Sequence, residues 1–351
     1  MSAGLAQYSR PNAELRGMIS RLLSPERLRA MAASPDLEGV LRLLLGTPYQ
    51  EVARGVLERG ATAEDAERSI VRGLVGAFRR TAFLLGGARA ALVVQMARRL
   101  ELENLKTILR AKARGEAVEA VRPLLIPMEG LSGLPYEELL RGEDVESVAR
   151  ALADTEYGSV LSSALPRYEA EGTLFPVETA LDLHYYRRLW QFLAGLSGSD
   201  LRVARRMLGI RYDVLNVDWI VRYRLIYRLY PEEIFNYTLP YGWRIDDAVV
   251  RRAGPAEALE GIASALPEPY RSLLTGVAGA PDPVERAELV LQRYLVTVAR
   301  SALSGYPFQI GVALAYLWLK EAEVHDLRSI LEAKGYGLPI EAIVDRFWRE
   351  G

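Results

Sequence analysis

The chain has 351 residues, of which half are hydrophobic and a quarter charged, and its formal net charge is −1. This balance is typical of an ordered globular protein with two or three domains, and it argues against a disordered chain or a nucleic-acid-binding surface. The absence of cysteine excludes disulfides, thiolate metal sites, iron–sulfur clusters and a cysteine nucleophile, and it fits a reducing compartment.

Helix signals begin early in the chain. Residues 1–17 carry charges and no apolar core, so we expect no secretory signal peptide. Capping residues before an acidic first turn predict helix starts at Ser24, at Thr62 and near Pro281. Apolar residues recur at i, i+3, i+4 and i+7 in long windows, namely 64–114, 177–196 and 284–333. Strand-like alternation is nearly absent, so the sequence predicts an all-α fold.

The most apolar stretch runs from Tyr306 to Leu319 and is interrupted by Gln309. It is shorter than the ~20 residues that a membrane-spanning helix needs. We therefore expect a buried core helix here and no transmembrane segment.

One helical motif occurs three times, at residues 101–112, 213–224 and 323–334. Each copy has a central Asn or Asp, an acid three residues before it, isoleucine four residues after it and a cation eight residues after it. The central residues are Asn104, Asn216 and Asp326; the acids are Glu101, Asp213 and Glu323; the cations are Lys112, Arg224 and Lys334. On a helix these positions share one face, beside an aliphatic stripe that should face the local core.

Two further markers accompany the motif. A tyrosine lies 55, 59 and 56 residues upstream of the central residue, as Tyr49, Tyr157 and Tyr270. An aliphatic–proline pair with a nearby glycine follows the first two copies, as Ile126-Pro127 with Gly130 and Leu239-Pro240 with Gly242, and the third copy shows no such marker before residue 351. The repeat predicts three similar helical-bundle domains with pseudo-threefold packing, at residues 1–117, 118–231 and 232–351.

The residues that most enzymes use are missing or scattered. The chain has two histidines, His184 and His325, which we expect to be structural, so we predict no metal site and no catalytic centre. Asp246-Asp247 lacks the third acid of a diphosphate-binding motif, because Val250 stands there. No glycine-rich phosphate loop is followed by Lys-Ser/Thr, so we expect no nucleotide and no cofactor.

The repeated acids Glu101, Asp213 and Glu323 have two interpretations. They can pair with neighbouring cations or backbone groups and so stabilise the fold. Alternatively, three equivalent polar stripes can line a central cavity that receives a partner. The two roles are compatible.

The motif Glu-x-x-Asn-Leu-x-x-Ile-x-x-x-Lys around Asn104, its second occurrence around Asn216 and the segment 306–328 together resemble a known family. They are similar to the C subunit of bacterial and archaeal V/A-type rotary ATPases, whose equivalent in eukaryotic V-ATPases is the d subunit. The likeness extends over the whole chain. One departure is Asp326, where the last copy in this family commonly has asparagine, so this copy has a carboxylate in place of the side-chain amide.

The resemblance implies a funnel of three helical domains with an axial cavity. It also implies a non-catalytic subunit on the cytoplasmic side of the membrane, peripheral to it. Such a protein would link the D and F subunits of the central shaft to the membrane proteolipid c-ring, and it would transmit torque for proton or sodium transport. It would need no nucleotide, nucleic acid or cofactor of its own.

Two other functions remain open from the residues alone. The repeat would also suit a free-standing helical scaffold unrelated to rotary ATPases. The all-α fold class would suit an enzyme acting on lipids or diphosphates, which would require an apolar pocket with convergent carboxylates.

Overall fold

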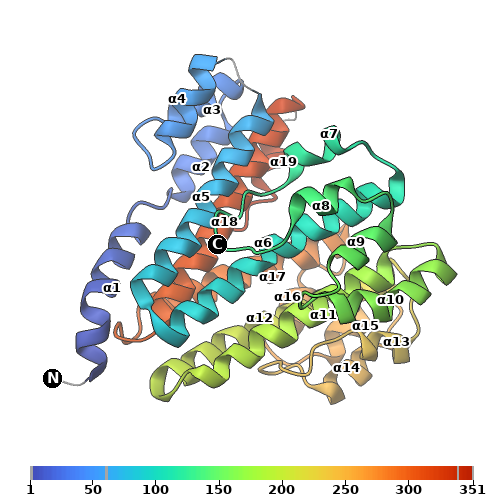
Figure 1. The fold of residues 1–351 in the computed structure, drawn as a ribbon. Helices are drawn as coiled ribbons and strands as arrows, with labels where there is room; N and C mark the ends of the chain where they lie inside the picture. Colours follow the sequence, from blue (N-terminus) through green and yellow to red (C-terminus); the bar gives the residue numbers. More distant parts are fainter. Residues whose placement is uncertain (1–2, 60–61, 338–339, 350–351) are drawn as a thin grey trace. The chain divides into compact units, whose positions relative to one another are not determined.

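The computed structural model describes residues 3–59, 62–337 and 340–349, and Figure 1 shows that the chain is built of helices. No strand occurs within these ranges, which confirms the predicted all-α fold. Internal contacts divide the chain into two compact units. Unit 1 comprises Met1–Leu85 and Leu196–Gly351, and unit 2 comprises Gly86–Gly195. The three predicted domain boundaries, the threefold arrangement and the funnel with its axial cavity stay predictions.

Unit 2 is a layer of two long helices with shorter helices beside them. The long helices are α6, Gly87–Arg114, and α11, Phe175–Gln191, which pack on each other. The shorter ones are α7 Val118–Val121, η1 Arg122–Leu124, α8 Tyr136–Arg141, α9 Val145–Ala151, α10 Gly158–Glu171 and η2 Phe192–Gly195. Aliphatic residues of α6 such as Leu105 and Leu109 are fully buried, as the predicted stripe requires.

Unit 1 is made from the N-terminal and C-terminal parts of the chain. Its first part contains α1 Ala3–Ile19, α2 Pro25–Ala32, α3 Leu37–Leu44, α4 Gln50–Arg59 and α5 Ala63–Leu85. Its second part contains α12 Gly198–Leu225, α13 Pro231–Asn236, α14 Asp247–Ala253, α15 Leu259–Ala265, α16 Tyr270–Thr275, α17 Pro283–Leu303, α18 Gly311–Gly335 and α19 Ile340–Val344.

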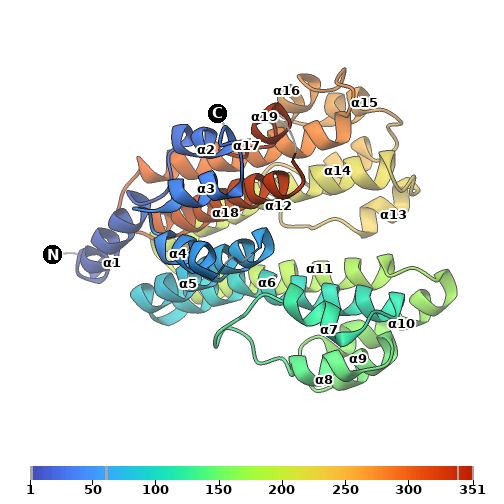
Figure 2. The ribbon, with the colours of Figure 1, turned by 90° about the horizontal axis from the view of Figure 1, so that it is seen from above.

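Helix α18 is the centre of unit 1. It packs along α5 on one side and along α17 on the other, as both views show (Figures 1 and 2). Every residue from Gly311 to Val324 is buried, so the helix has no solvent-facing stripe over that length. Helices from opposite parts of the sequence therefore share one core.

The helix starts follow local capping chemistry. Ser24 accepts a hydrogen bond from Arg27 N, and α2 begins at the next residue, Pro25. The predicted starts at Thr62 and near Pro281 are also confirmed, by α5 and α17. Such caps satisfy amide groups that have no partner in the first turn of a helix.

The predicted core helix over residues 306–319 is only partly right. Helix α18 begins at Gly311, and Tyr306 lies outside it with 58% of its surface exposed. Pro307 explains the difference, because it lacks an amide hydrogen and disfavours helical backbone at the residue before it. Among the described residues, no helix is both long enough and apolar enough to cross a membrane.

Substituting Leu314→Ala tests the central role of α18. The Leu314 side chain is fully buried, so the change should lower the free energy of unfolding by about 3 kcal/mol through lost burial and the cavity that remains. Urea denaturation followed by circular dichroism measures the effect. Leu124→Ala is the control, because Leu124 is 61% exposed and its loss should change stability by less than about 0.5 kcal/mol. Equal effects of the two substitutions would contradict this assignment of the core.

Candidate functional site

The three motif acids lie in the protein interior, and each accepts a hydrogen bond from a motif tyrosine. At most 2% of the surface of Glu101, Asp213 or Glu323 is exposed. Their partners are Tyr157 for Glu101 at 2.7 Å, Tyr270 for Asp213 at 2.8 Å and Tyr49 for Glu323 at 2.6 Å. The same tyrosine–carboxylate contact therefore occurs once on each of the helices α6, α12 and α18.

These contacts differ from the pairing suggested by sequence order, in which each tyrosine belongs with the motif that follows it. Tyr157 and Tyr270 instead bond to the motif helix that precedes them. The third contact connects distant parts of the chain, since Tyr49 and Glu323 are 274 residues apart. The third cluster is thus assembled from the N-terminal and C-terminal parts of unit 1.

A short local turn positions two of the tyrosines. The hydroxyl of Thr47 donates to Leu44 O and accepts from Tyr49 N. Thr155 makes the same two bonds with Leu152 O and Tyr157 N. This hydroxyl bridge ends one helix and fixes the tyrosine just before the next.

The Asp213 carboxylate accepts hydrogen bonds from backbone amides as well as from its tyrosine. Besides the Tyr270 hydroxyl, it accepts hydrogen bonds from Arg244 N at 2.9 Å and Ile245 N at 2.9 Å. Burial raises the pKa of Asp213, while the backbone donors act against that rise. Gly242 is required beside it, because a Cβ atom there would lie 2.2 Å from Ile245 O and 2.5 Å from Asp213 Oδ1. This explains one glycine of the sequence marker.

The central asparagines anchor the loops that follow their helices. Asn104 Nδ2 donates to Ile126 O at 2.8 Å, and its Oδ1 accepts from Ile126 N at 2.7 Å. Asn216 makes the same pair of bonds with Leu239, both at 2.8 Å. Each anchored residue precedes a proline, which has no amide hydrogen to offer. One side-chain amide, which donates once through Nδ2 and accepts once through Oδ1, therefore matches the C=O and N–H of one backbone residue.

In the third copy, Asp326 holds its loop differently. Its carboxylate accepts hydrogen bonds from Trp348 N at 2.8 Å and Arg349 N at 3.2 Å. Arg349 has an amide hydrogen where Pro127 and Pro240 have none, so a second donor is available. A carboxylate that only accepts is thus matched to two donors, and the departure from asparagine has a physical reason.

The motif cations reach backbone carbonyls in two copies. Lys112 Nζ donates to Leu140 O at 2.6 Å. Arg224 donates to Ala256 O at 2.9 Å and to Leu229 O at 3.2 Å. For Lys334, which is half-buried, no side-chain hydrogen bond is found within the described part of the chain.

The clusters bind the protein's own groups and do not suit acid–base catalysis. Burial and the neighbouring carboxylates raise the pKa of Tyr49, Tyr157 and Tyr270, so the phenols remain protonated donors. The described residues contain no group of three His, Cys, Asp or Glu side chains that could hold a metal ion.

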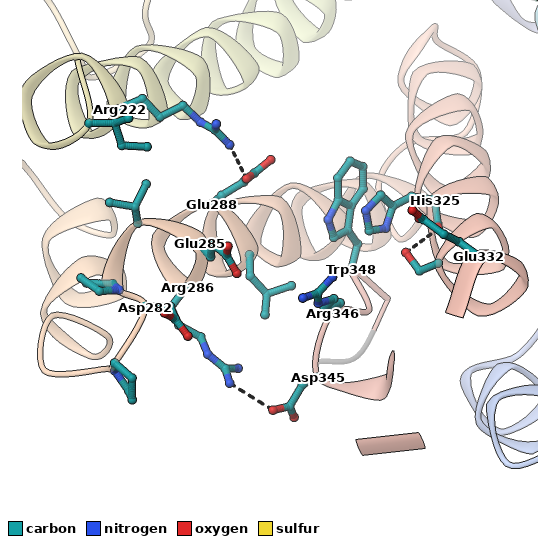
Figure 3. A pocket seen from close by; sticks show the side chains of 16 residues that line it. Arg222, Asp282, Glu285, Arg286, Glu288, His325, Glu332, Asp345, Arg346 and Trp348 are labelled. Atoms are coloured by element: carbon teal, nitrogen blue, oxygen red, sulfur yellow. Dashed lines mark hydrogen bonds and ion pairs between the residues drawn. The ribbon is translucent and has the colours of Figure 1, made fainter. Parts of the chain in front are cut away.

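A pocket of about 840 Å³ lies in unit 1 between the C-terminal end of α12, the start of α17, the second half of α18 and the loop 345–348. Figure 3 shows two ion pairs facing into it, Arg222 with Glu288 and Arg286 with Asp345. One wall is formed by His325, whose ring stacks on Trp348 with centroids 3.7 Å apart. Most of its lining residues are polar or charged.

Ser329 and His325 at this wall do not form a nucleophile–base system with the buried Asp326. His325 Nδ1 lies 3.3 Å from Asp326 Oδ1, but Asp326 is already bonded to two backbone amides. The Ser329 hydroxyl donates to the backbone oxygen of His325 and not to its ring. Without a ring nitrogen as its base, the serine is not activated.

Asp218 shares Arg222 with Glu288 at the edge of the pocket. Arg222 Nε lies 3.1 Å from Asp218 Oδ2, and 17% of the Asp218 side chain is exposed. Burial raises the pKa of Asp218 to about 6, with a further rise from Glu288 and an opposing effect of Arg222.

Sequence reasoning missed several members of the third cluster, although part of the signal was present. Trp348 follows Asp326 by 22 residues, the same spacing as Ile126 after Asn104. The sequence marker is defined by its proline, which the third copy lacks, so the marker does not identify this equivalent loop. Lys320 and Leu23, which both donate to Glu323, have no counterpart in the motif.

Comparison with known proteins identifies a family whose members are similar to this chain. The family described as ATP synthase (C/AC39) subunit matches residues 11–346. A protein of Methanothermobacter thermautotrophicus, named as the C subunit of an A-type ATP synthase, is 28% identical over 340 residues, covering 94% of this chain and 84% of the relative. One of Deinococcus radiodurans, named as the C subunit of a V-type ATP synthase, is also 28% identical over 340 residues, covering 96% and 90%.

Substituting Asn216→Asp tests the loop anchor. The carboxylate would face the carbonyl oxygen of Leu239 without a donor, so we expect a loss of about 3 kcal/mol in the free energy of unfolding at pH 7. The loss should shrink at acidic pH, where a protonated carboxyl regains a donor. Thermal and urea unfolding measure it. The exposed Asn236→Asp adds the same charge without a buried bond, and a similar loss in that control would refute the anchor.

Asp218 should make stability depend on pH. Because its folded pKa of about 6 exceeds its unfolded value, the folded protein binds more protons between pH 4 and 6. The free energy of unfolding of the wild type should therefore fall relative to Asp218→Asn as pH rises through this window, by up to about 3 kcal/mol, and the difference should be constant above pH 7. Urea unfolding of both proteins at pH 4.5 to 8 gives the difference. A constant difference at every pH would contradict the assignment.

Proposed function

Since this chain belongs to the C/AC39 subunit family of ATP synthases, we propose that it is the non-catalytic rotor subunit that joins the central shaft to the membrane proteolipid ring. In this role it is a socket that passes torque between the two. The torque couples proton or sodium transport to ATP hydrolysis or synthesis in other subunits.

The observation that carries the proposal is the length of the family match. It extends from residue 11 to residue 346 and so includes both compact units. The relatives in Methanothermobacter thermautotrophicus and Deinococcus radiodurans are covered over 84% and 90% of their own lengths. A likeness of this extent favours the same role in the same kind of complex.

The motif geometry supports a mechanical role for the repeat residues. Asn104, Asn216 and Asp326 each fasten a loop to a long helix, and each motif acid fastens a tyrosine from another segment. Buried hydrogen bonds of this kind resist sliding of one segment past another, because a broken bond leaves a buried polar group without a partner. We interpret the predicted repeat residues other than Lys334 as side chains that hold segments together within three repeated helical domains.

The partners proposed are the D and F subunits of the shaft on one face and the proteolipid ring on the other, at the cytoplasmic side of the membrane. Large aromatic side chains favour such contacts, because they contribute much binding free energy at interface centres. Tyr230 and Tyr336 in unit 1 are 74% and 77% exposed. These two are the first positions to test.

Binding and coupling assays test the proposal. The purified chain should co-elute with a shaft complex of D and F and with detergent-solubilised proteolipid ring. A rotary complex assembled without it should still hydrolyse ATP but should no longer drive ion uptake into vesicles, and adding the chain should restore uptake.

The isolated chain should show no ATP hydrolysis above buffer. Binding to neither partner would reject the socket role and favour a free-standing scaffold. Hydrolysis by the isolated chain, sensitive to substitution of its own residues, would reject the non-catalytic assignment.

A further inference from the structure

The loop of residues 345–349 is held on one side by an arginine ladder on α17. Arg286, Arg293 and Arg300 are spaced by seven residues, so they lie near one face of the helix. Arg286 pairs with the Asp345 carboxylate at 3.1 Å, as Figure 3 shows. Further along, Arg293 donates to Phe347 O and Arg300 to Arg349 O, both at 2.9 Å.

Helix α18 holds the other side of the same loop. Asp326 accepts from the backbone of Trp348 and Arg349, and the His325 ring stacks on the Trp348 indole at 9°. The loop is therefore fixed between two helices of the C-terminal part of unit 1.

Arg349 continues the connection to the N-terminal part. Its Nη1 donates to Leu23 O and lies 3.3 Å from Glu323 Oε2. Glu323 in turn accepts from Leu23 N and from the Tyr49 hydroxyl. Both backbone groups of Leu23, the residue before the cap of α2, are thus bonded to the C-terminal part of the chain.

Four charges meet at this junction. Lys320, Glu323, Asp326 and Arg349 are each at most 7% exposed, and they comprise two cations and two carboxylates. Burial lowers the pKa of Arg349, which means that its charge is held at a cost. Removing one member leaves an unbalanced charge in the interior, and opening the junction to water relieves it.

We propose that residues 345–349 form a C-terminal strap that closes the third motif cluster and can open as a unit, freeing α2 from α18 while the rest of the protein stays folded. In the other two clusters the anchored loop runs on along the chain to α8 or α14, so its release frees no distant segment. The strap is independent of the rotor role proposed above.

Hydrogen exchange of the full chain, read by mass spectrometry, tests the strap in the variant Asp326→Asn. In this variant the side-chain NH2 group would face the backbone N–H of Trp348 or Arg349, so two donors would meet without an acceptor. The loss of the carboxylate charge would also leave one buried cation without a balancing anion. We expect the amides of residues 22–32 and 340–349 to exchange about 100-fold faster than in the wild type. Residues 87–114 of α6 and 198–225 of α12 should keep wild-type protection.

Two further variants separate the strap from general damage. Arg349→Met keeps both backbone donors for Asp326 but removes the bond to Leu23, and it should open residues 22–32 in the same way. Asn216→Asp is the matched control, because it should loosen residues 236–245 and leave residues 22–32 unchanged.

Faster exchange confined to residues 345–349 in both strap variants would show that the N-terminal and C-terminal segments are not coupled. Loss of protection throughout unit 1 would show that the strap does not open separately. Wild-type exchange in both variants would show that the charges do not hold the loop. Each of these results overturns the proposal.

Discussion

A carboxylate buried on a long helix must be met by hydrogen-bond donors, and this requirement organises the structure around α6, α12 and α18. Glu101, Asp213 and Glu323 each accept a hydrogen bond from a tyrosine hydroxyl of another segment. That segment comes later in the chain for Glu101 and Asp213 and earlier in the chain for Glu323. The donor that completes each carboxylate also fixes where a shorter helix begins. The central Asn or Asp, one turn further along, fixes the loop that follows its long helix. The three copies therefore share an arrangement of buried side-chain hydrogen bonds as well as an arrangement of helices.

The sequence predicted most of the helices, their buried faces and the repeat residues that make these contacts, because 3.6-residue periodicity and capping chemistry are local. It did not predict which tyrosine serves which acid. A tyrosine lies at a similar distance on both sides of Asn104, namely Tyr49 and Tyr157, and a periodic sequence does not say which neighbour closes a cluster. The third loop escapes prediction for a related reason. Its marker is a proline in the other copies, whereas Arg349 takes that place and supplies the extra amide that Asp326 needs.

The function could be predicted from individual residues less directly than the fold. The role proposed above, transmission of torque, needs no nucleophile, metal or phosphate loop, so it would leave little signature in single residues. The structure shows buried hydrogen bonds and ion pairs that hold segments together. The assignment to a rotary complex comes from the family match over residues 11–346. Ser329, His325 and Asp326 lie close together on α18, but the Ser329 hydroxyl is bonded to a backbone carbonyl, which the residue types alone do not reveal.

The contact between Tyr49 and Glu323 also has a consequence for synthesis. Because the partners are 274 residues apart, α18 leaves the ribosome long after α2 to α5. At about 5–20 residues per second, this delay is roughly 15–55 s. During that time the face of α5 that later packs on α18 has no partner, so the newly made N-terminal helices expose apolar surface that a chaperone could cover.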